Sequence, residues 1–230
     1  MRVKNKYYKK YHMHKSKYCV NESPVAISDY MSGKMQNIGS ISTSCEKNPI
    51  CLARMKAGDS ICAECFAYNT VRRYSELGKN CAMNYELLTS EVLPVEMLPI
   101  FKPEVEIIRI ESFGDVGNVT HAINYINIIN ANPHVTFAWW SKNAWIINEA
   151  FAQCGKPKNV VMIESSEKLN VQKEKSENFD KVFTVYDSEH IASGNVNINC
   201  GARSCDTCRR CYSKRTGAVV NEKLKGVKAA

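Results

Sequence analysis

Four cysteines within twelve residues near the C-terminus constrain this chain more than any other feature. Cys200, Cys205, Cys208 and Cys211 have the spacing C-x4-C-x2-C-x2-C. Gaps of two residues let successive thiolates converge on one small inorganic core, as in bacterial ferredoxins. Structural zinc sites more often use two separated C-x2-C turns, because a tetrahedral ion needs ligands from two sides. We therefore expect a [4Fe-4S] cluster here, with zinc as the alternative.

A second group of cysteines lies near the N-terminus with the looser spacing C-x5-C-x10-C-x2-C: Cys45, Cys51, Cys62 and Cys65. Four cysteines so close together predict a second metal site. Two alternatives stay open: one of the four is a spectator, or both groups supply ligands to one shared cluster. If only three of the N-terminal cysteines bind the metal, one iron is left open to a substrate or cofactor. Cys19, Cys81 and Cys154 are isolated, and we assign them no role.

The composition is that of a globular protein with one substantial core in 230 residues. No apolar run reaches the roughly 18 residues of a membrane span, and the basic N-terminus lacks the apolar stretch of a secretory signal. We therefore expect a cytoplasmic protein. In a reducing compartment, clustered cysteines indicate metal rather than disulfides.

The net charge of +8 is concentrated at the two ends of the chain. Residues 1–21 contain seven basic and no acidic residues, and residues 203–230 contain eight basic and two acidic ones. Tyrosines interleave with the N-terminal lysines, a pattern compatible with an arm that binds nucleic acid or a host protein. The alternative is a solvated tail that does no more than keep the protein in solution.

The expected organisation is a flexible basic arm over residues 1–22, a single α/β domain over 23–215 and a basic tail over 216–230. Within the domain, residues 24–66 have weak periodicity and predict irregular structure around cysteine ligands. A helical pattern runs from Cys65 to Leu88, and Gly78 is expected to end its first part.

After three prolines the pattern changes to strands alternating with helices. Strands are expected over 104–111, 134–140, 160–164 and 181–186, and helices over 121–129 and 143–154. Such alternation favours a parallel sheet built from βαβ units. With four or five countable strands, the fold class is α/β, a partial (βα) barrel or small parallel sheet, with cysteine-rich irregular segments at both ends.

Sites in parallel sheets lie beyond the carboxyl ends of the strands. That rule selects Glu111, Gly114, Asp115 and Lys142, and Arg109, inside the preceding apolar strand, must find a partner. Glu111, Asp115 and Lys142 are the candidate catalytic residues, and Arg109, Gly114, Asp115 and Lys142 are the candidate ligand-binding residues. Gly114 would allow close backbone approach or a positive φ. The alternative for Arg109 is a structural ion pair with Glu111 on the same face of the strand.

Several short motifs, in this order, resemble the bacteriophage family labelled gene product 88. They are Asn37-Ile38-Gly39-Ser40-Ile41-Ser42 leading to Cys45, Cys65-Phe66-Ala67 opening a helix with Asn84, Arg109 followed by Gly114-Asp115, Ser141-Lys142, and the four C-terminal cysteines. The resemblance covers roughly residues 34–215. It implies a phage protein acting in the host cytoplasm, with a shortened radical-SAM-like barrel, iron–sulfur clusters and S-adenosylmethionine as cofactor.

The chain departs from the radical-SAM pattern at two places. The C-x3-C-x2-C signature is absent, since Cys62 and Cys65 keep only its last gap, and Phe113 stands where a small polar residue is expected. Two functions follow as hypotheses. One is an iron–sulfur enzyme with its reactive cluster in the N-terminal group; the other is a non-catalytic iron–sulfur or zinc protein that binds nucleic acid or a host protein through its basic ends.

Overall fold

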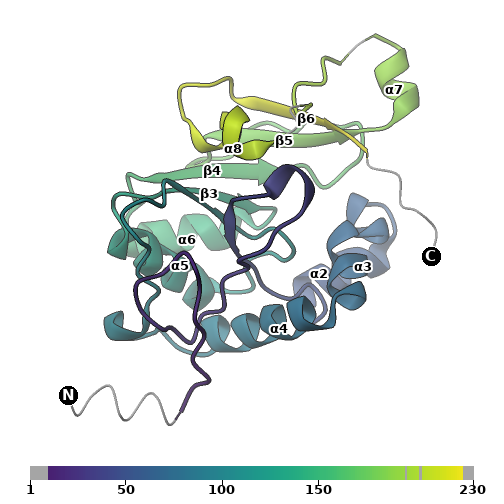
Figure 1. Cartoon of the computed structure of the whole chain (residues 1–230). Coiled ribbons are helices and arrows are strands. Elements are labelled where there is room, and N and C mark those ends of the chain that lie inside the picture. The colour runs from purple at the N-terminus through teal and green to yellow at the C-terminus, as the bar shows by residue number, and fades with distance from the viewer. Residues whose placement is uncertain (1–9, 195, 202–203, 225–230) are drawn as a thin grey trace.

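The chain folds around one sheet of six parallel strands, which follow one another across the sheet in chain order (Figure 1). The computed structural model describes residues 10–194, 196–201 and 204–224. The strands are β1 (Gly39–Ile41), β2 (Ile107–Ile110), β3 (Thr136–Ser141), β4 (Val160–Ser165), β5 (Lys181–Tyr186) and β6 (Val219–Lys223). β1 and β6 are the two edges, so the sheet is open rather than a closed barrel.

The first face of the sheet is covered by long helices. The helices of the described residues are α2 (Pro49–Ala57), α3 (Phe66–Arg73), α4 (Ser75–Ser90), α5 (Val119–Ala131), α6 (Ala144–Cys154), α7 (Ser188–Ala192) and α8 (Cys205–Cys208). In Figure 1, α5 and α6 lie beneath β3 and β4. Ile108, Phe137 and Met162 face this side, where they join the main core with Tyr125 of α5 and Phe151 of α6.

The second face of the sheet is covered by short 3-10 turns and by the C-terminal cysteine segment. These turns are η1 (Gly33–Met35) and η4 (Arg210–Tyr212); η2 (Ile61–Glu64) and η3 (Val95–Met97) lie elsewhere. Successive strand residues point to opposite faces, so Ile107, Trp140 and Ile163 pack here against Met35 and Tyr212. α8 lies on the side of the sheet opposite α5 and α6 (Figure 1).

The predicted strands and helices between residues 104 and 186 are confirmed, with bounds shifted by up to three residues. Two strands were missed. β1 lies within the segment expected to be irregular, and β6 lies within the expected basic tail, where it pairs with β5. Both are short, and their stability comes from pairing with a neighbour rather than from a local pattern.

The expectation that Gly78 ends a helix is wrong, because Gly78 lies inside α4. The break falls at Tyr74, between α3 and α4. A Cβ atom at Gly78 would stand 2.6 Å from the carbonyl oxygen of Val71, so glycine here allows the two helices to pack closely.

Part of the expected N-terminal arm is docked on the domain. His14 forms an antiparallel bridge with Ser23, and Cys19 forms another with Phe101. Residues 1–9 and 225–230, which contain the rest of the expected basic ends, lie outside the described residues. No helix in the described ranges is both long and apolar enough to span a membrane.

Candidate metal centres on the sheet

The four N-terminal cysteines come together in the segment that follows β1. Cys45 lies in the loop after the strand, Cys51 on α2, Cys62 on η2 and Cys65 at the N-cap of α3. The thiol of Cys45 is hydrogen-bonded to that of Cys65. Cys51 interacts electrostatically with both Cys45 and Cys62. The structure therefore groups the cysteines that the sequence selected, although they lie on four different local elements.

Buried polar contacts fix this segment against the sheet. Asn84 of α4 donates 3.0 Å to the carbonyl of Ser42, just after β1. Asn48 caps α2 by accepting 3.0 Å from the backbone N–H of Ile50, and its amide donates 2.9 Å to the carbonyl of Asp115. α2, which carries Cys51, is thereby tied to the loop that follows β2.

The pKa of the Cys65 thiol is lowered from its usual value. Its pKa is lowered to about 6 by the hydrogen bond from Cys45, helped by the backbone N–H groups of Tyr68 and Ala67 in the first turn of α3 and by the charge of Lys142. The pKa of Cys45 is raised because its thiol donates to Cys65 and is buried. A thiolate at neutral pH is the species that binds iron or zinc.

Asp115 joins the carboxyl ends of β2 and β3. Its carboxylate is 6% exposed and accepts hydrogen bonds from the hydroxyl of Ser141 at 2.6 Å and from the backbone N–H of Lys142 at 2.9 Å. Arg54 of α2 lies 3.9 Å away. Burial raises the pKa of Asp115, against the effect of Lys142 and these hydrogen bonds. Both carboxylate oxygens thus accept hydrogen bonds from the residues that end β3 and follow it.

Glu111 turns into the interior at the end of β2. Its φ of 59° breaks the strand alternation, and its carboxylate accepts from the backbone N–H and the hydroxyl of Thr43 at 3.0 and 2.6 Å. The Tyr125 hydroxyl donates a third bond at 2.8 Å, and burial raises the Glu111 pKa to about 7. The alternative of an Arg109–Glu111 ion pair on one face is wrong, because the left-handed residue directs Glu111 away from the face that Arg109 occupies.

Gly114 is the point where the β2 loop meets the β1 loop. A Cβ atom there would stand 2.4 Å from the carbonyl oxygen of Thr43. Gly114 therefore makes the expected close backbone approach. It contacts the backbone of Thr43, two residues before Cys45.

Lys142 is the strand-end residue that faces the N-terminal cysteines. Its positive charge favours the ionised forms of Asp115, Cys51 and Cys65, and so acts to lower the pKa of each group. No carboxylate within the described residues forms an ion pair with its ammonium group. Of the candidate ligand-binding residues at the strand ends, Lys142 is therefore the one whose charge remains directed at the cysteine group.

The C-terminal cysteines lie against the second face of the sheet. Cys205 and Cys208 begin and end α8, and Cys211 lies in η4. Cys205 and Cys211 pack against the Met35, Trp140 and Tyr212 cluster. The backbone N–H of Cys200 donates 3.0 Å to the carbonyl of Asn221 in β6. The four thiols interact electrostatically, Cys211 with Cys200 and Cys205, and Cys205 with Cys208.

Arg109 belongs to this second face and not to the strand-end loops. Its guanidinium lies 3.9 Å from the ring centroid of Trp140 and 3.8 Å from the sulfur of Met35. Its charge acts on Cys205 and Cys211. The set of strand-end residues predicted from the sequence is therefore divided between two sites.

One residue packs against the surroundings of both cysteine groups. Met31 packs both against the cluster that contains Cys205 and Cys211 and against the one that contains Cys45 and Cys51. One side chain thus contacts the surroundings of both sites.

The four thiols of each group are the donor type that iron–sulfur clusters and structural zinc ions take. Within the described parts of the chain, no three His, Cys, Asp or Glu side chains are arranged to hold a single metal ion. A [4Fe-4S] cluster binds each thiolate to a different iron, so its ligands stand farther apart than those of one zinc ion.

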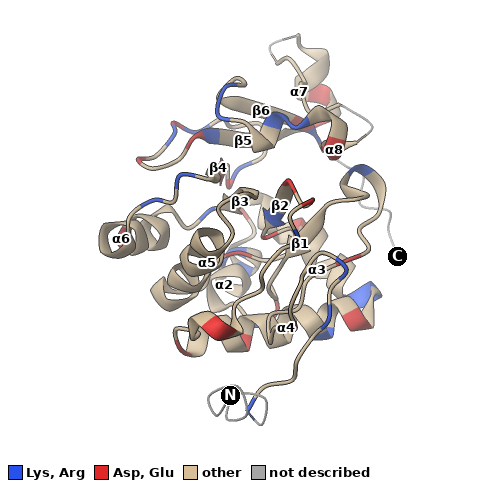
Figure 2. Cartoon of the chain, turned by 60° about the vertical axis from the view of Figure 1, so that its left-hand side comes forward, with Lys and Arg blue, Asp and Glu red and all other residues tan. Residues whose placement is uncertain are grey.

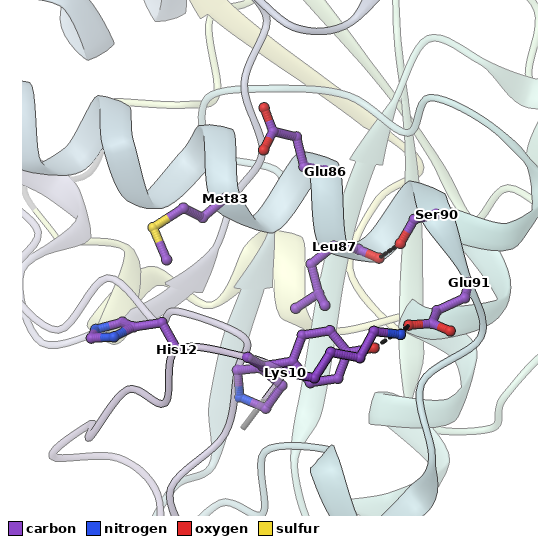
Figure 3. Close-up of a pocket in the computed structure, with 9 residues that line it drawn as sticks. Lys10, His12, Met83, Glu86, Leu87, Ser90 and Glu91 are labelled. Carbon is purple, nitrogen blue, oxygen red and sulfur yellow. Dashed lines mark hydrogen bonds and ion pairs between the residues drawn. The ribbon is translucent and has the colours of Figure 1, made fainter. Parts of the chain in front are cut away.

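A pocket of about 520 Å³ lies elsewhere, between the N-terminal segment and α4 (Figure 3). It is lined by Lys10, Tyr11, His12, Pro24, Met83, Glu86, Leu87, Ser90 and Glu91. Lys10 and Tyr11 both bond to Glu91. None of the predicted site residues lines this pocket, so we assign it no role in the chemistry.

Of the three described lysines of the N-terminal arm, two pair with the chain's own acids, and the ammonium of Lys17 lies over the rings of Tyr18 and Tyr30. Lys10 pairs with Glu91, and Lys15 lies 3.3 Å from Glu22. Lys, Arg, Asp and Glu are spread over several elements of the described fold (Figure 2). This distribution gives no support to a nucleic-acid surface in the part of the chain that the structure describes.

Lys34, Arg54 and Thr43 take part in the two sites but were missed in the sequence. Lys34 donates 2.9 Å to the carbonyl of Cys200, a residue 166 positions away. Contacts at such separation leave no local pattern, so no signal in this one sequence would have found them.

The open parallel sheet and its cysteine groups define an α/β protein with a thiol-rich site on the second face and another at the strand ends. The family model described as Gene product 88 matches residues 7–226, and the chain belongs to the gene product 88 family. No curated protein and no solved structure matches the chain. The resemblance to the gene product 88 family is therefore confirmed over almost the whole chain.

Proposed function

We propose that this chain is an iron–sulfur protein that holds one [4Fe-4S] cluster in each cysteine group, with the N-terminal group as the reactive centre. The observation that carries the proposal is the convergence of Cys45, Cys51, Cys62 and Cys65 beside Lys142, at the carboxyl ends of the parallel strands. Ligands of parallel α/β sheets bind at this edge. The C-terminal group instead packs against a face of the sheet, which suits electron transfer or stabilisation.

The strand-end residues have different roles in this proposal. Lys142 lies near Cys51 and Cys65, where its ammonium group would balance the charge of a cluster or bind an anionic group of a ligand. Asp115 is a positioning residue, because it holds the Lys142 backbone N–H at 2.9 Å. Glu111 is another, because it holds Thr43, two residues before Cys45. A [4Fe-4S] cluster supplies one-electron transfer and, where one iron lacks a protein ligand, a binding position for a small molecule.

The finer proposal is a radical-SAM-like enzyme that uses S-adenosylmethionine. Supporting it are six parallel strands in chain order and a cysteine-bearing segment directly after the first strand. The proposal requires that one of the four N-terminal cysteines is not a ligand, so that an iron stays open.

Metal analysis tests the main proposal. The chain is purified anaerobically, and iron, sulfide and zinc are quantified per chain. We expect a brown protein with about eight irons, four for each cluster. A colourless protein that contains zinc would overturn the proposal, and about four irons would reduce it to one cluster.

A separate experiment tests the use of S-adenosylmethionine. The reconstituted protein is incubated with S-adenosylmethionine and dithionite without oxygen. We expect formation of 5′-deoxyadenosine and a change in the cluster's EPR signal. Absence of both, in a chain that carries its irons, would remove this cofactor and leave the two-cluster protein.

A further inference from the structure

The second face of the sheet carries a positive charge that the described protein does not neutralise. Arg109 lies on β2 with its guanidinium over Trp140, a cation–π contact that retains the full charge. Its Nε is buried and has no hydrogen-bond partner. No carboxylate among the described residues forms an ion pair with it. A cation in such a place costs free energy unless an anion lies nearby.

The groups beside Arg109 are the C-terminal cysteines. Cys205 and Cys211 pack into the same cluster as Met35, Trp140 and Tyr212, two of which contact the guanidinium directly. The hydroxyl of Tyr212 is also buried without a partner. Two buried polar atoms without a hydrogen-bond partner therefore lie beside Cys205 and Cys211.

A second cation lies beside the first cysteine of the same group. The ammonium of Lys34 lies 2.9 Å from the carbonyl oxygen and 3.9 Å from the sulfur of Cys200. It also pairs with Glu222 at 3.1 Å. Thiols are neutral, so two cations directed at them gain little unless the cysteines carry negative charge.

We infer that Arg109 and Lys34 are the counter-ions of an anionic metal–thiolate centre bound by Cys200, Cys205, Cys208 and Cys211, and that Arg109 sets its reduction potential. This inference rests on the proposed function for the presence of the cluster. Four thiolates give a [4Fe-4S] cluster a net negative charge that grows on reduction. A nearby cation stabilises the reduced form more than the oxidised one, so it raises the reduction potential.

The test compares R109Q, which removes the charge, with R109K, which keeps it. R215Q is the matched control, because Arg215 carries the same charge but is exposed, four residues after Cys211. Each variant is made in the full chain with Cys45→Ser and Cys65→Ser, so that the remaining EPR signal comes from the C-terminal group. Metal content and reduction potential are measured by EPR-monitored redox titration, and folding is followed by circular dichroism.

We expect R109Q to shift the potential downward, with a change on the order of tenfold in the oxidised-to-reduced ratio, or about 59 mV for one electron. R109K should shift it less, and R215Q should leave it unchanged. K34Q should shift it in the same direction as R109Q and serves as the second variant if R109Q does not fold. Loss of the cluster from R109Q but not from R109K would also support the inference.

Two results would overturn it. One is equal potentials in R109Q, R215Q and the parent; the other is loss of the cluster from both R109Q and R109K, which would assign Arg109 a packing role. A parent chain without iron would instead overturn the proposed function. If that chain carries zinc, the rates at which R109Q and R109K release zinc to a chelator are compared. Equal rates would overturn the counter-ion role.

Discussion

Tyr125 donates a 2.8 Å hydrogen bond to Oε1 of Glu111, whose side chain is fully buried. Burial raises the Glu111 pKa from 4.5 to about 7. His121 lies 3.6 Å away, and burial lowers its pKa to about 3, so its imidazole is neutral near pH 7. The link between the end of β2 and α5 is therefore a hydrogen-bonded buried acid and not an ion pair.

The first prediction concerns the pH dependence of stability. Between pH 4.5 and 7, folded Glu111 keeps a proton that the unfolded chain releases. Its contribution to the unfolding free energy therefore falls as pH rises through this window, by roughly 3 kcal/mol in total. His121 acts oppositely, and its contribution is lost as pH falls below 6.5.

Urea denaturation of the parent and of E111Q at several pH values measures this effect. Because His121 is present in both, their difference in unfolding free energy isolates Glu111. We expect the unfolding free energy of the parent to fall relative to that of E111Q as the pH rises from 5 to 8. A difference that does not vary with pH would contradict the prediction.

The second prediction concerns the contact of Gly114 with Thr43. G114A places a methyl group 2.4 Å from the Thr43 carbonyl oxygen, so the β1 loop must move. We expect a loss of about 1–3 kcal/mol of unfolding free energy and less iron in the N-terminal group, because Cys45 follows in that loop. G217A is the control, since the Cβ added there meets only Arg210 at an ordinary 3.9 Å. Equal stability of the two variants would refute this.

The third prediction concerns which cysteines bind iron. C45S, C51S and C65S should each lower the iron content by about half and leave the C-terminal cluster in place, because a serine hydroxyl is a poor replacement for a thiolate. C154S is the matched control, since Cys154 is exposed on α6. Iron and sulfide analysis with EPR measures the result. Loss of all iron from a single N-terminal substitution would favour one shared cluster.

The fourth prediction concerns Lys181, which is 1% exposed on β5. Its ammonium donates to the carbonyl and hydroxyl of Thr216 at 2.8 and 2.9 Å and to the carbonyl of Gly217 at 2.9 Å. K181M should cost about 1–3 kcal/mol and loosen the segment that follows Cys211, so that the C-terminal metal is released faster to a chelator. K158M, at an exposed position, should change neither quantity. Unchanged release from K181M would show that this anchor does not support the C-terminal site.

Much of the fold was predictable because its middle elements have strong local patterns. β3, α6, β4 and β5 bury apolar side chains at the spacing of a strand or a helix, and their predicted bounds are nearly right. β1 and β6 have three and five residues, too few for such a pattern to stand out. The separation of Glu111 from Arg109 was also beyond local reasoning, because it depends on the positive φ of Glu111.

The sequence by itself determined that this is a parallel α/β protein with two groups of closely spaced cysteines, since spacing and periodicity are local properties of the chain. Only the tertiary structure decided what stands beside each group. Lys142 meets the N-terminal cysteines because parallel strands end at one edge of the sheet. Arg109 and Lys34 meet the C-terminal cysteines because the chain returns across the second face after β5. These contacts join residues separated by up to 166 positions, and such proximity arises from strand order and packing rather than from any local pattern.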